Sequence, residues 1–124
     1  MGAIGIELAE DHLAAARDLL ASGRINQAAG ISYQAIDVAY ACLIERVNGN
    51  DQMGHRQRWL RAEQLGICTE EVSLRLWRAR NIGFYANARA GDERVTLDIE
   101  EARWAVRTAE GIVRRVRAML DLRK

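Results

Sequence analysis

Residues 78–87 combine side chains that can bind a phosphate or a nucleic-acid base. They include two arginines, two asparagines and a tyrosine in otherwise apolar sequence. A guanidinium beside a phenol hydroxyl can hold a phosphate or stack on a base, which is the chemistry that an RNA or nucleotide site needs. On an ideal helix Arg78, Asn81 and Tyr85 share a face, while Arg80 points about a third of a turn or more away. These four residues are the candidate RNA- or nucleotide-binding residues, although a helix–helix contact would use the same residue types.

The histidines and cysteines do not indicate an enzyme site or a metal site. His12 and His55 have neither a second histidine nor an acid at catalytic or metal-binding spacing, and we interpret them as surface or interface residues. Cys42 and Cys68 add no paired spacing. We find no phosphate-cradling glycine loop, paired-carboxylate signature or nucleophile elbow. The sequence therefore predicts no metal and no cofactor.

The tryptophans and the basic C-terminal end have ordinary structural interpretations. Trp59, Trp77 and Trp104 could stack on bases, but an isolated tryptophan at helical spacing is more often a core or interface anchor. The arginines and lysine within residues 114–124 complement the dipole at the end of a helix. We therefore interpret the tryptophans as packing residues and this basic end as a solvated helix terminus.

Composition predicts one all-α domain over residues 1–124. Proline is absent, and alanine, leucine, arginine and glutamate, which favour helix, dominate the 124 residues. The net charge is +1, a weaker basic excess than in a dedicated nucleic-acid-binding domain. Two cysteines without paired spacing fit a reducing compartment. No apolar run is long enough for a membrane span or signal peptide, so we expect a cytoplasmic protein without membrane contact.

Apolar periodicity divides the chain into an antiparallel bundle of four to five helices. The pattern predicts helices over residues 7–21, 25–47, 55–65, about 70–88 and about 97–122, with Thr69 and Thr96 as N-caps. Gly83 weakens the fourth helix and gives its backbone room to loosen. The second helix keeps small residues on one face, namely Ala28, Ser32, Ala35, Ala39 and Cys42. The last helix carries a seam with steps of three and four, namely Ile99, Ala102, Val106, Ala109, Val113, Val116 and Leu120.

The chain resembles the HEPN family of helical prokaryotic proteins. Arg80 and Asn81 match the start of the family signature, an arginine followed by a polar residue and, a few residues later, a histidine. The family histidine would fall on Tyr85, where this sequence departs from the pattern. Softer similarity covers most of the chain, in the segments LLASG, AAGISYQAIDVAYACLIERVNG and EEARWAVRTAEGIVRRVRAML.

The resemblance implies a homodimer whose arginines and histidines meet in a cleft between subunits and cut RNA without metal. Many members resemble toxins paired with a small nucleotidyltransferase in a toxin–antitoxin module. Members with tyrosine in place of the histidine are regarded as binding or partner subunits, since a tyrosine with a pKa of about 10 is a poor general base at neutral pH.

Three functions remain open on the sequence. The first is a HEPN-like binding or partner protein with a degenerate RNA or nucleotide site, containing Arg78, Arg80, Asn81 and Tyr85. The second is an active metal-independent ribonuclease with Arg80 and Tyr85 as catalytic candidates. The third is a purely structural helical assembly subunit.

Overall fold

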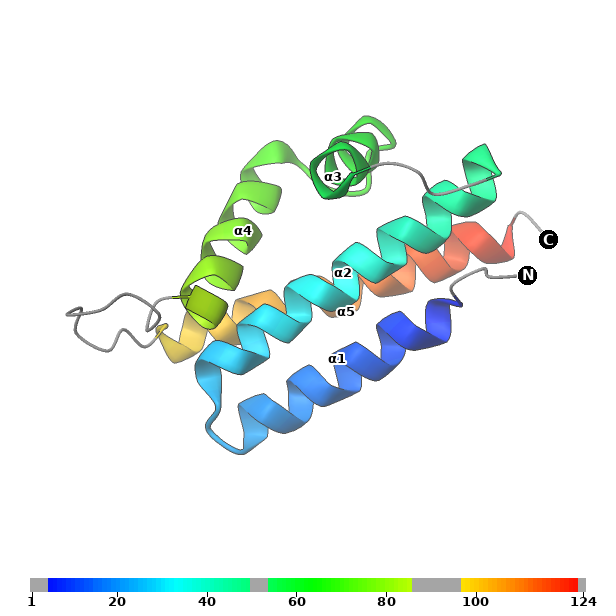
Figure 1. Ribbon diagram of the computed structural model, residues 1–124. Coiled ribbons are helices and arrows are strands. Elements are labelled where there is room, and N and C mark those ends of the chain that lie inside the picture. Colours follow the sequence, from blue (N-terminus) through cyan, green and yellow to red (C-terminus); the bar gives the residue numbers. More distant parts are fainter. Residues whose placement is uncertain (1–4, 50–53, 86–96, 123–124) are drawn as a thin grey trace.

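The computed structural model describes residues 5–49, 54–85 and 97–122, apart from the side chain of Tyr85. All of its regular elements in these residues are helices, which confirms the all-α bundle predicted from the sequence (Figure 1). Their bounds are Ile6–Ala21 for α1, Ile25–Asn48 for α2, His55–Gln64 for α3, Glu70–Tyr85 for α4 and Ile99–Asp121 for α5.

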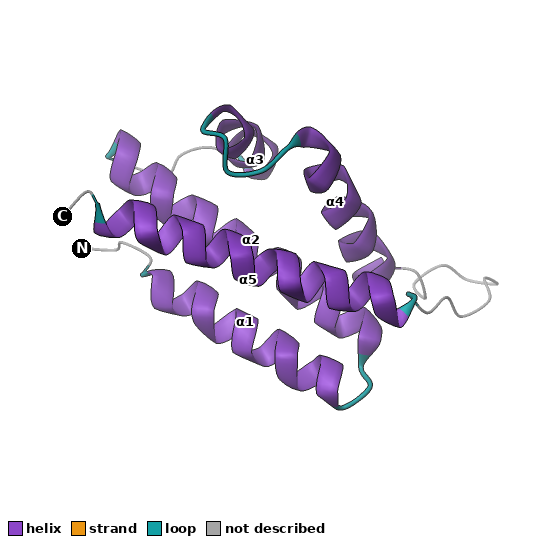
Figure 2. Ribbon diagram, turned by 180° about the vertical axis from the view of Figure 1, so that it is seen from behind, coloured by secondary structure: helices purple, strands orange, loops and turns teal. Residues whose placement is uncertain are grey.

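The five helices form two groups around α2. The long helices α1, α2 and α5 lie side by side, and α3 and α4 pack on another side of α2 (Figures 1 and 2). Helix α1 runs antiparallel to α2, and α5 runs in the same direction as α2 (Figure 1). Because α2 contacts all four other helices, it is the central element of the fold.

The small-residue face of α2 explains its central position. Ala28, Ser32, Ala35, Ala39 and Cys42 are all buried, as the sequence predicts. Small side chains let neighbouring helices approach closely, so α2 can pack against α1 and α5 together. The Ser32 hydroxyl donates to the Ala28 carbonyl oxygen at 2.8 Å, which satisfies the polar group within the helix.

The seam of α5 is confirmed except at its first position. All its predicted members from Ala102 to Leu120 are buried, whereas Ile99 is 42% exposed. The prediction for Ile99 was wrong because α5 begins there: the Asp98 carboxylate caps the helix by accepting from the Glu100 backbone N–H at 2.7 Å. Leu97 is buried in its place, and its N–H donates to the Asn26 side-chain oxygen at 2.7 Å. The other predicted cap, Thr96, lies outside the described residues.

Glycines determine how closely α4 crosses α2. A side chain at Gly83 would overlap the Asn26 backbone carbonyl oxygen and lie 3.2 Å from the Gly30 nitrogen. A side chain at Gly30 would in turn overlap the Phe84 ring. Although glycine weakens a helix, α4 continues through Gly83 to Tyr85, as the predicted fourth helix does. Because Gly83 has no side chain, the backbones of α4 and α2 can come into contact. Residues 86–88 of the predicted helix lie outside the described residues.

Gly66 and Thr69 form the connection from α3 to α4 in the way that the sequence predicts. Gly66 has φ +77°, a left-handed conformation that favours glycine, and ends the turn that follows α3. The Val72 N–H donates to the Thr69 hydroxyl at 3.2 Å, which confirms the predicted cap at the start of α4. Within residues 5–49, 54–85 and 97–122, no helix combines the length and apolar character required to cross a bilayer.

Candidate functional site

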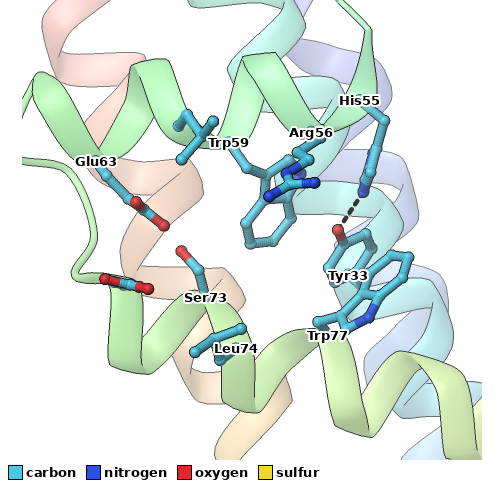
Figure 3. A pocket seen from close by; sticks show the side chains of 10 residues that line it. Tyr33, His55, Arg56, Trp59, Glu63, Ser73, Leu74 and Trp77 are labelled. Carbon is cyan, nitrogen blue, oxygen red and sulfur yellow. Dashed lines mark hydrogen bonds between the residues drawn. The ribbon is translucent and has the colours of Figure 1, made fainter.

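Helices α2, α3 and α4 enclose a groove of about 410 Å³ with aromatic walls. This groove is the one drawn in Figure 3: Tyr33 comes from α2, His55 and Trp59 from α3, and Trp77 from α4. Its volume lies in the usual range for small-molecule sites, about 300–1,000 Å³. Leu60 and Leu74, each about half exposed, also line it. Apolar surface exposed in a concave site is typical of a binding surface.

Asp37 is the hub of a hydrogen-bond network that ties α3 to α2. Its Oδ1 accepts from His55 Nδ1 and Trp59 Nε1, each at 3.0 Å. Its Oδ2 accepts from Arg58 Nη1 at 2.8 Å. The Asp37 side chain is 15% exposed, and partly buried charge-assisted hydrogen bonds of this kind are stronger than neutral ones. The network therefore fixes the orientation of three α3 side chains at once.

His55 links Asp37 to Tyr33. With its Nδ1 proton donated to Asp37, the His55 ring presents its Nε2 lone pair to the Tyr33 hydroxyl, which donates to it (Figure 3). A carboxylate that orients an imidazole in this way selects the tautomer whose other nitrogen can accept a proton. The arrangement therefore places an oriented proton acceptor on the wall of the groove.

Tyr33 is held in its neutral form. Burial of the ring, and next the nearby Asp37 carboxylate, raise the pKa of its hydroxyl well above the ordinary value, while the Arg80 guanidinium acts in the opposite direction. A neutral phenol keeps its proton and can donate it to His55 Nε2. Tyr33 is consequently a hydrogen-bond donor, and not a nucleophile, at neutral pH.

The aromatic rings differ in exposure. Tyr33 stacks on Trp59 with centroids 4.3 Å apart and ring planes 9° apart, and Trp59 is only 6% exposed. Trp77 leans against Tyr33 at 5.8 Å and is 40% exposed. Trp104 is partly buried under the Arg75 guanidinium. Packing thus describes Trp59 and Trp104, whereas Trp77 remains partly exposed where it lines the groove.

The predicted site residues do not all converge. The Arg80 guanidinium carbon lies 5.0 Å from the Trp77 ring centre and 5.8 Å from that of Tyr33, beside the groove. Its Nη1 donates to the Asn81 side-chain oxygen at 3.1 Å. Arg78 is exposed, and no ion pair or hydrogen bond joins its side chain to another described residue. Tyr85 ends α4, and its side chain lies outside the described residues.

Asp37 and its partners were not predicted as site residues. His55 was interpreted as a surface or interface residue because no acid lies at catalytic or metal-binding spacing from it in the sequence, yet Asp37 is its partner at 3.0 Å. One signal was present: Asp37 is a lone charge within the apolar run from Ala35 to Ile44, on the same helix face as Tyr33. His55 on α3 gives no comparable signal in the sequence, because its hydrogen bond to Asp37 depends on how α3 packs against α2.

The aromatic walls of the groove suit a flat ring, and His55 Nε2 is the atom oriented to accept a proton. Among the described residues, no cluster of His, Cys, Asp and Glu side chains has the composition and proximity to hold a metal ion. Cys42 and Cys68 are not joined in a disulfide.

Comparison with known proteins gives no match: no family model, curated protein or solved structure is similar to this chain.

Proposed function

We propose that the chain is an RNA- or nucleotide-binding protein that uses the groove between α2, α3 and α4. The observation that carries the proposal is the position of Arg80 beside the exposed ring of Trp77. An arginine next to an open indole face can hold a phosphate while the indole stacks on the adjoining base. The neighbouring rings of Tyr33 and Trp59 continue this apolar wall into the groove.

The HEPN resemblance supports the same proposal from the sequence. Arg80 and Asn81, the residues that match the family signature, are hydrogen-bonded to each other beside the groove. We propose accordingly a cytoplasmic HEPN-like binding or partner protein that forms a homodimer or pairs with a small nucleotidyltransferase in a toxin–antitoxin-type module. Light scattering at micromolar concentration distinguishes the monomer from the homodimer, and co-purification with the nucleotidyltransferase tests the pairing.

The proposal is tested by RNA binding to a pair of matched arginine variants. Arg80→Ala removes the guanidinium beside the groove, whereas Arg78→Ala removes an exposed guanidinium from the same helix. With a short fluorescent single-stranded RNA of mixed sequence, we expect Arg80→Ala to weaken binding about tenfold and Arg78→Ala to leave it nearly unchanged. Equal effects of the two variants would contradict a site at the groove.

Trp77→Ala is the second arm of this test. Loss of a stacking ring costs roughly 1–3 kcal/mol per base, so binding should weaken by about tenfold or more. Trp104→Ala, which removes a tryptophan covered by Arg75 outside the groove, is the control. Circular dichroism must show that both variants keep their helices.

A second function, metal-independent RNA cleavage, is favoured by the Asp37–His55 pair. In this reaction His55 Nε2 would take the proton of a ribose 2′-hydroxyl, in the position now occupied by the Tyr33 hydroxyl. The 2′-oxygen would then bond to the adjacent phosphorus, and the bond from phosphorus to the 5′-oxygen would break. Water gives that oxygen a proton, and His55 returns to water the proton that it took, so the products carry a 2′,3′-cyclic phosphate and a 5′-hydroxyl.

Cleavage of single-stranded RNA in the presence of a chelator separates binding from catalysis. The binding proposal predicts no cleavage by the natural chain, with Tyr85→His as the substitution expected to confer it. Cleavage that His55→Ala abolishes would favour the enzyme. Cleavage that Tyr85→Phe abolishes would favour the arrangement implied by the HEPN signature. Loss of stability alone in Arg80→Ala, without any RNA binding by the natural chain, would favour a structural subunit.

A further inference from the structure

The groove has a carboxylate-lined end, defined by Glu63, Glu70 and Ser73. Figure 3 shows the Glu63 side chain on α3 and the Ser73 side chain on α4 pointing toward one another. Neither Glu63 nor Glu70 has a hydrogen-bond or ion-pair partner among the described residues. The Ser73 hydroxyl is buried and donates only to the Cys68 sulfur, at 3.7 Å, a weak contact. This end thus offers strong acceptors and an exchangeable donor.

The other end of the groove is basic. His55 and Arg56 line it, and Arg80 lies next to its Trp77 wall. The Arg56 side chain is exposed and, like those of Glu63 and Glu70, forms no ion pair or hydrogen bond with another described residue. Between the two ends lie aromatic rings (Figure 3). A complementary ligand therefore carries N–H donors at one end, a flat ring in the middle and an anion at the other end.

Among the common nucleotides, this pattern matches guanine best. Its Watson–Crick edge has two adjacent N–H donors, which fit the two oxygens of one carboxylate, followed by a carbonyl acceptor, which fits a hydroxyl donor. Adenine and cytosine each place a ring acceptor beside their amine, and uracil has a single N–H between two carbonyls. A carboxylate would repel these acceptors.

We infer that the groove selects guanine nucleotides, with the guanine edge read by Glu63 and Ser73, the ring stacked on Trp77, and the phosphate held by Arg56 and Arg80. The inference rests on the proposed function and adds the base that the site recognises. Glu70 lies beside the same end and supplies a second acceptor. The source of the guanine, a free nucleotide or a strand of RNA, is left to the experiment.

The test compares nucleotides on the natural chain by tryptophan fluorescence. We expect GMP to bind at least about tenfold more tightly than AMP, CMP or UMP. IMP, which lacks only the amine at position 2, should bind about tenfold more weakly than GMP because one carboxylate oxygen loses its donor. Equal binding of all five nucleotides would overturn the inference and leave the proposed function standing. No binding of any nucleotide or of RNA would overturn both.

Glu63→Gln tests directly whether the Glu63 carboxylate recognises the guanine edge. The amide replaces one acceptor oxygen with a donor, so GMP binding should weaken about tenfold while AMP binding stays unchanged or improves. Glu7→Gln on α1, outside the groove, is the matched control. If Glu63→Gln weakens all nucleotides equally, or does not affect GMP, guanine reading by Glu63 is wrong. The IMP comparison keeps the inference testable if this variant fails to fold.

Binding of two RNA strands distinguishes a free guanine nucleotide from RNA as the source of the guanine. A short oligouridylate with a single central guanosine is compared with the same strand without it, and with GMP. Binding by the guanosine strand far above both indicates an RNA strand as the source, and binding no tighter than GMP indicates a free nucleotide. A strand preference that does not depend on the guanosine would overturn the inference. An arginine amide probe that displaces GMP at equal concentration would also overturn it, because the groove would then select cations.

Discussion

Two regions of the molecule differ in where their polar groups form hydrogen bonds. One is the long-helix layer of α1, α2 and α5, and the other is the groove formed by α2, α3 and α4. The layer buries alanines and branched aliphatic residues, and the hydroxyl of Ser32 is satisfied within its own helix. The groove concentrates polar bonds between helices, most of them on Asp37. Apolar contacts are individually weak and tolerant, whereas each hydrogen bond of the network needs a particular partner. We expect the layer to set stability and the groove to set recognition.

The largest expected effect is on stability, from truncation within the layer. Ile36 is fully buried on α2, so Ile36→Ala should lower the free energy of unfolding by roughly 2–5 kcal/mol. Urea denaturation measures this loss. If the natural chain binds RNA as proposed, the folded fraction of Ile36→Ala should bind RNA equally well. A loss of binding by fully folded Ile36→Ala would show that the two regions are not separate in function.

Asp37→Asn should have the next largest effect, and it should be local. The substitution removes the charge that accepts from His55, Arg58 and Trp59, so we expect a loss of roughly 1–3 kcal/mol. Hydrogen exchange should accelerate in α3 far more than in α1 and α5. The exposed Asp18, replaced by Asn, provides the control on α1. Uniform acceleration throughout the chain would mean that α3 does not move independently.

High pH should destabilise the protein through two tyrosines on α2. Burial is the main factor that raises the pKa of both Tyr33 and Tyr40 above the ordinary value of 10.0. The unfolded chain loses these hydroxyl protons at lower pH than the folded chain. The contribution of the two tyrosines to the free energy of unfolding is therefore complete below pH 10 and is lost as the pH rises further. The free energy of unfolding should fall by up to about 1.4 kcal/mol per pH unit for each tyrosine.

Urea unfolding at about pH 9 and about pH 11 measures that loss. The double variant Tyr33→Phe and Tyr40→Phe should lose less stability between these conditions than the natural chain. The two sites differ at neutral pH: Tyr33→Phe removes a hydrogen bond to His55, whereas the buried Tyr40 hydroxyl has no hydrogen-bond partner among the described residues. An unchanged pH dependence in the double variant would assign the alkaline loss to other groups.

The smallest effect is expected at a surface ion pair that joins α4 to α5 away from the groove. Arg75 Nε donates to Glu101 at 3.1 Å, and this contact is the main cause that lowers the pKa of the Glu101 carboxyl. Both side chains are well exposed, so solvent screens the pair. Glu101→Gln should cost no more than about 0.5 kcal/mol, an effect visible as a small shift in Tm at low salt only.

The sequence predicts the long-helix layer better than the groove, for a physical reason. Helix periodicity is local, so the buried faces of α2 and α5 could be identified within single segments. The network of Asp37 and His55 joins residues 18 positions apart, and its formation depends on the packing angle of a ten-residue helix. Arg80 was predicted because Arg80 and Asn81 resemble the start of the HEPN signature, and Arg78 was predicted with it because the sequence did not decide which arginine belongs to that signature.

The crossing of α2 and α4 has a consequence for natural and laboratory variation. Arg80 is three residues before Gly83, which contacts the α2 backbone directly. In a saturation library, the exposed positions of α4 such as Leu74 and Arg78 should accept many residue types in a selection for folding. Gly83 should stand out as a position that admits almost none, since the obstacle is a backbone carbonyl that no rotamer change can move. A single glycine thereby sets the lateral position of Arg80 beside the rings of Tyr33 and Trp77.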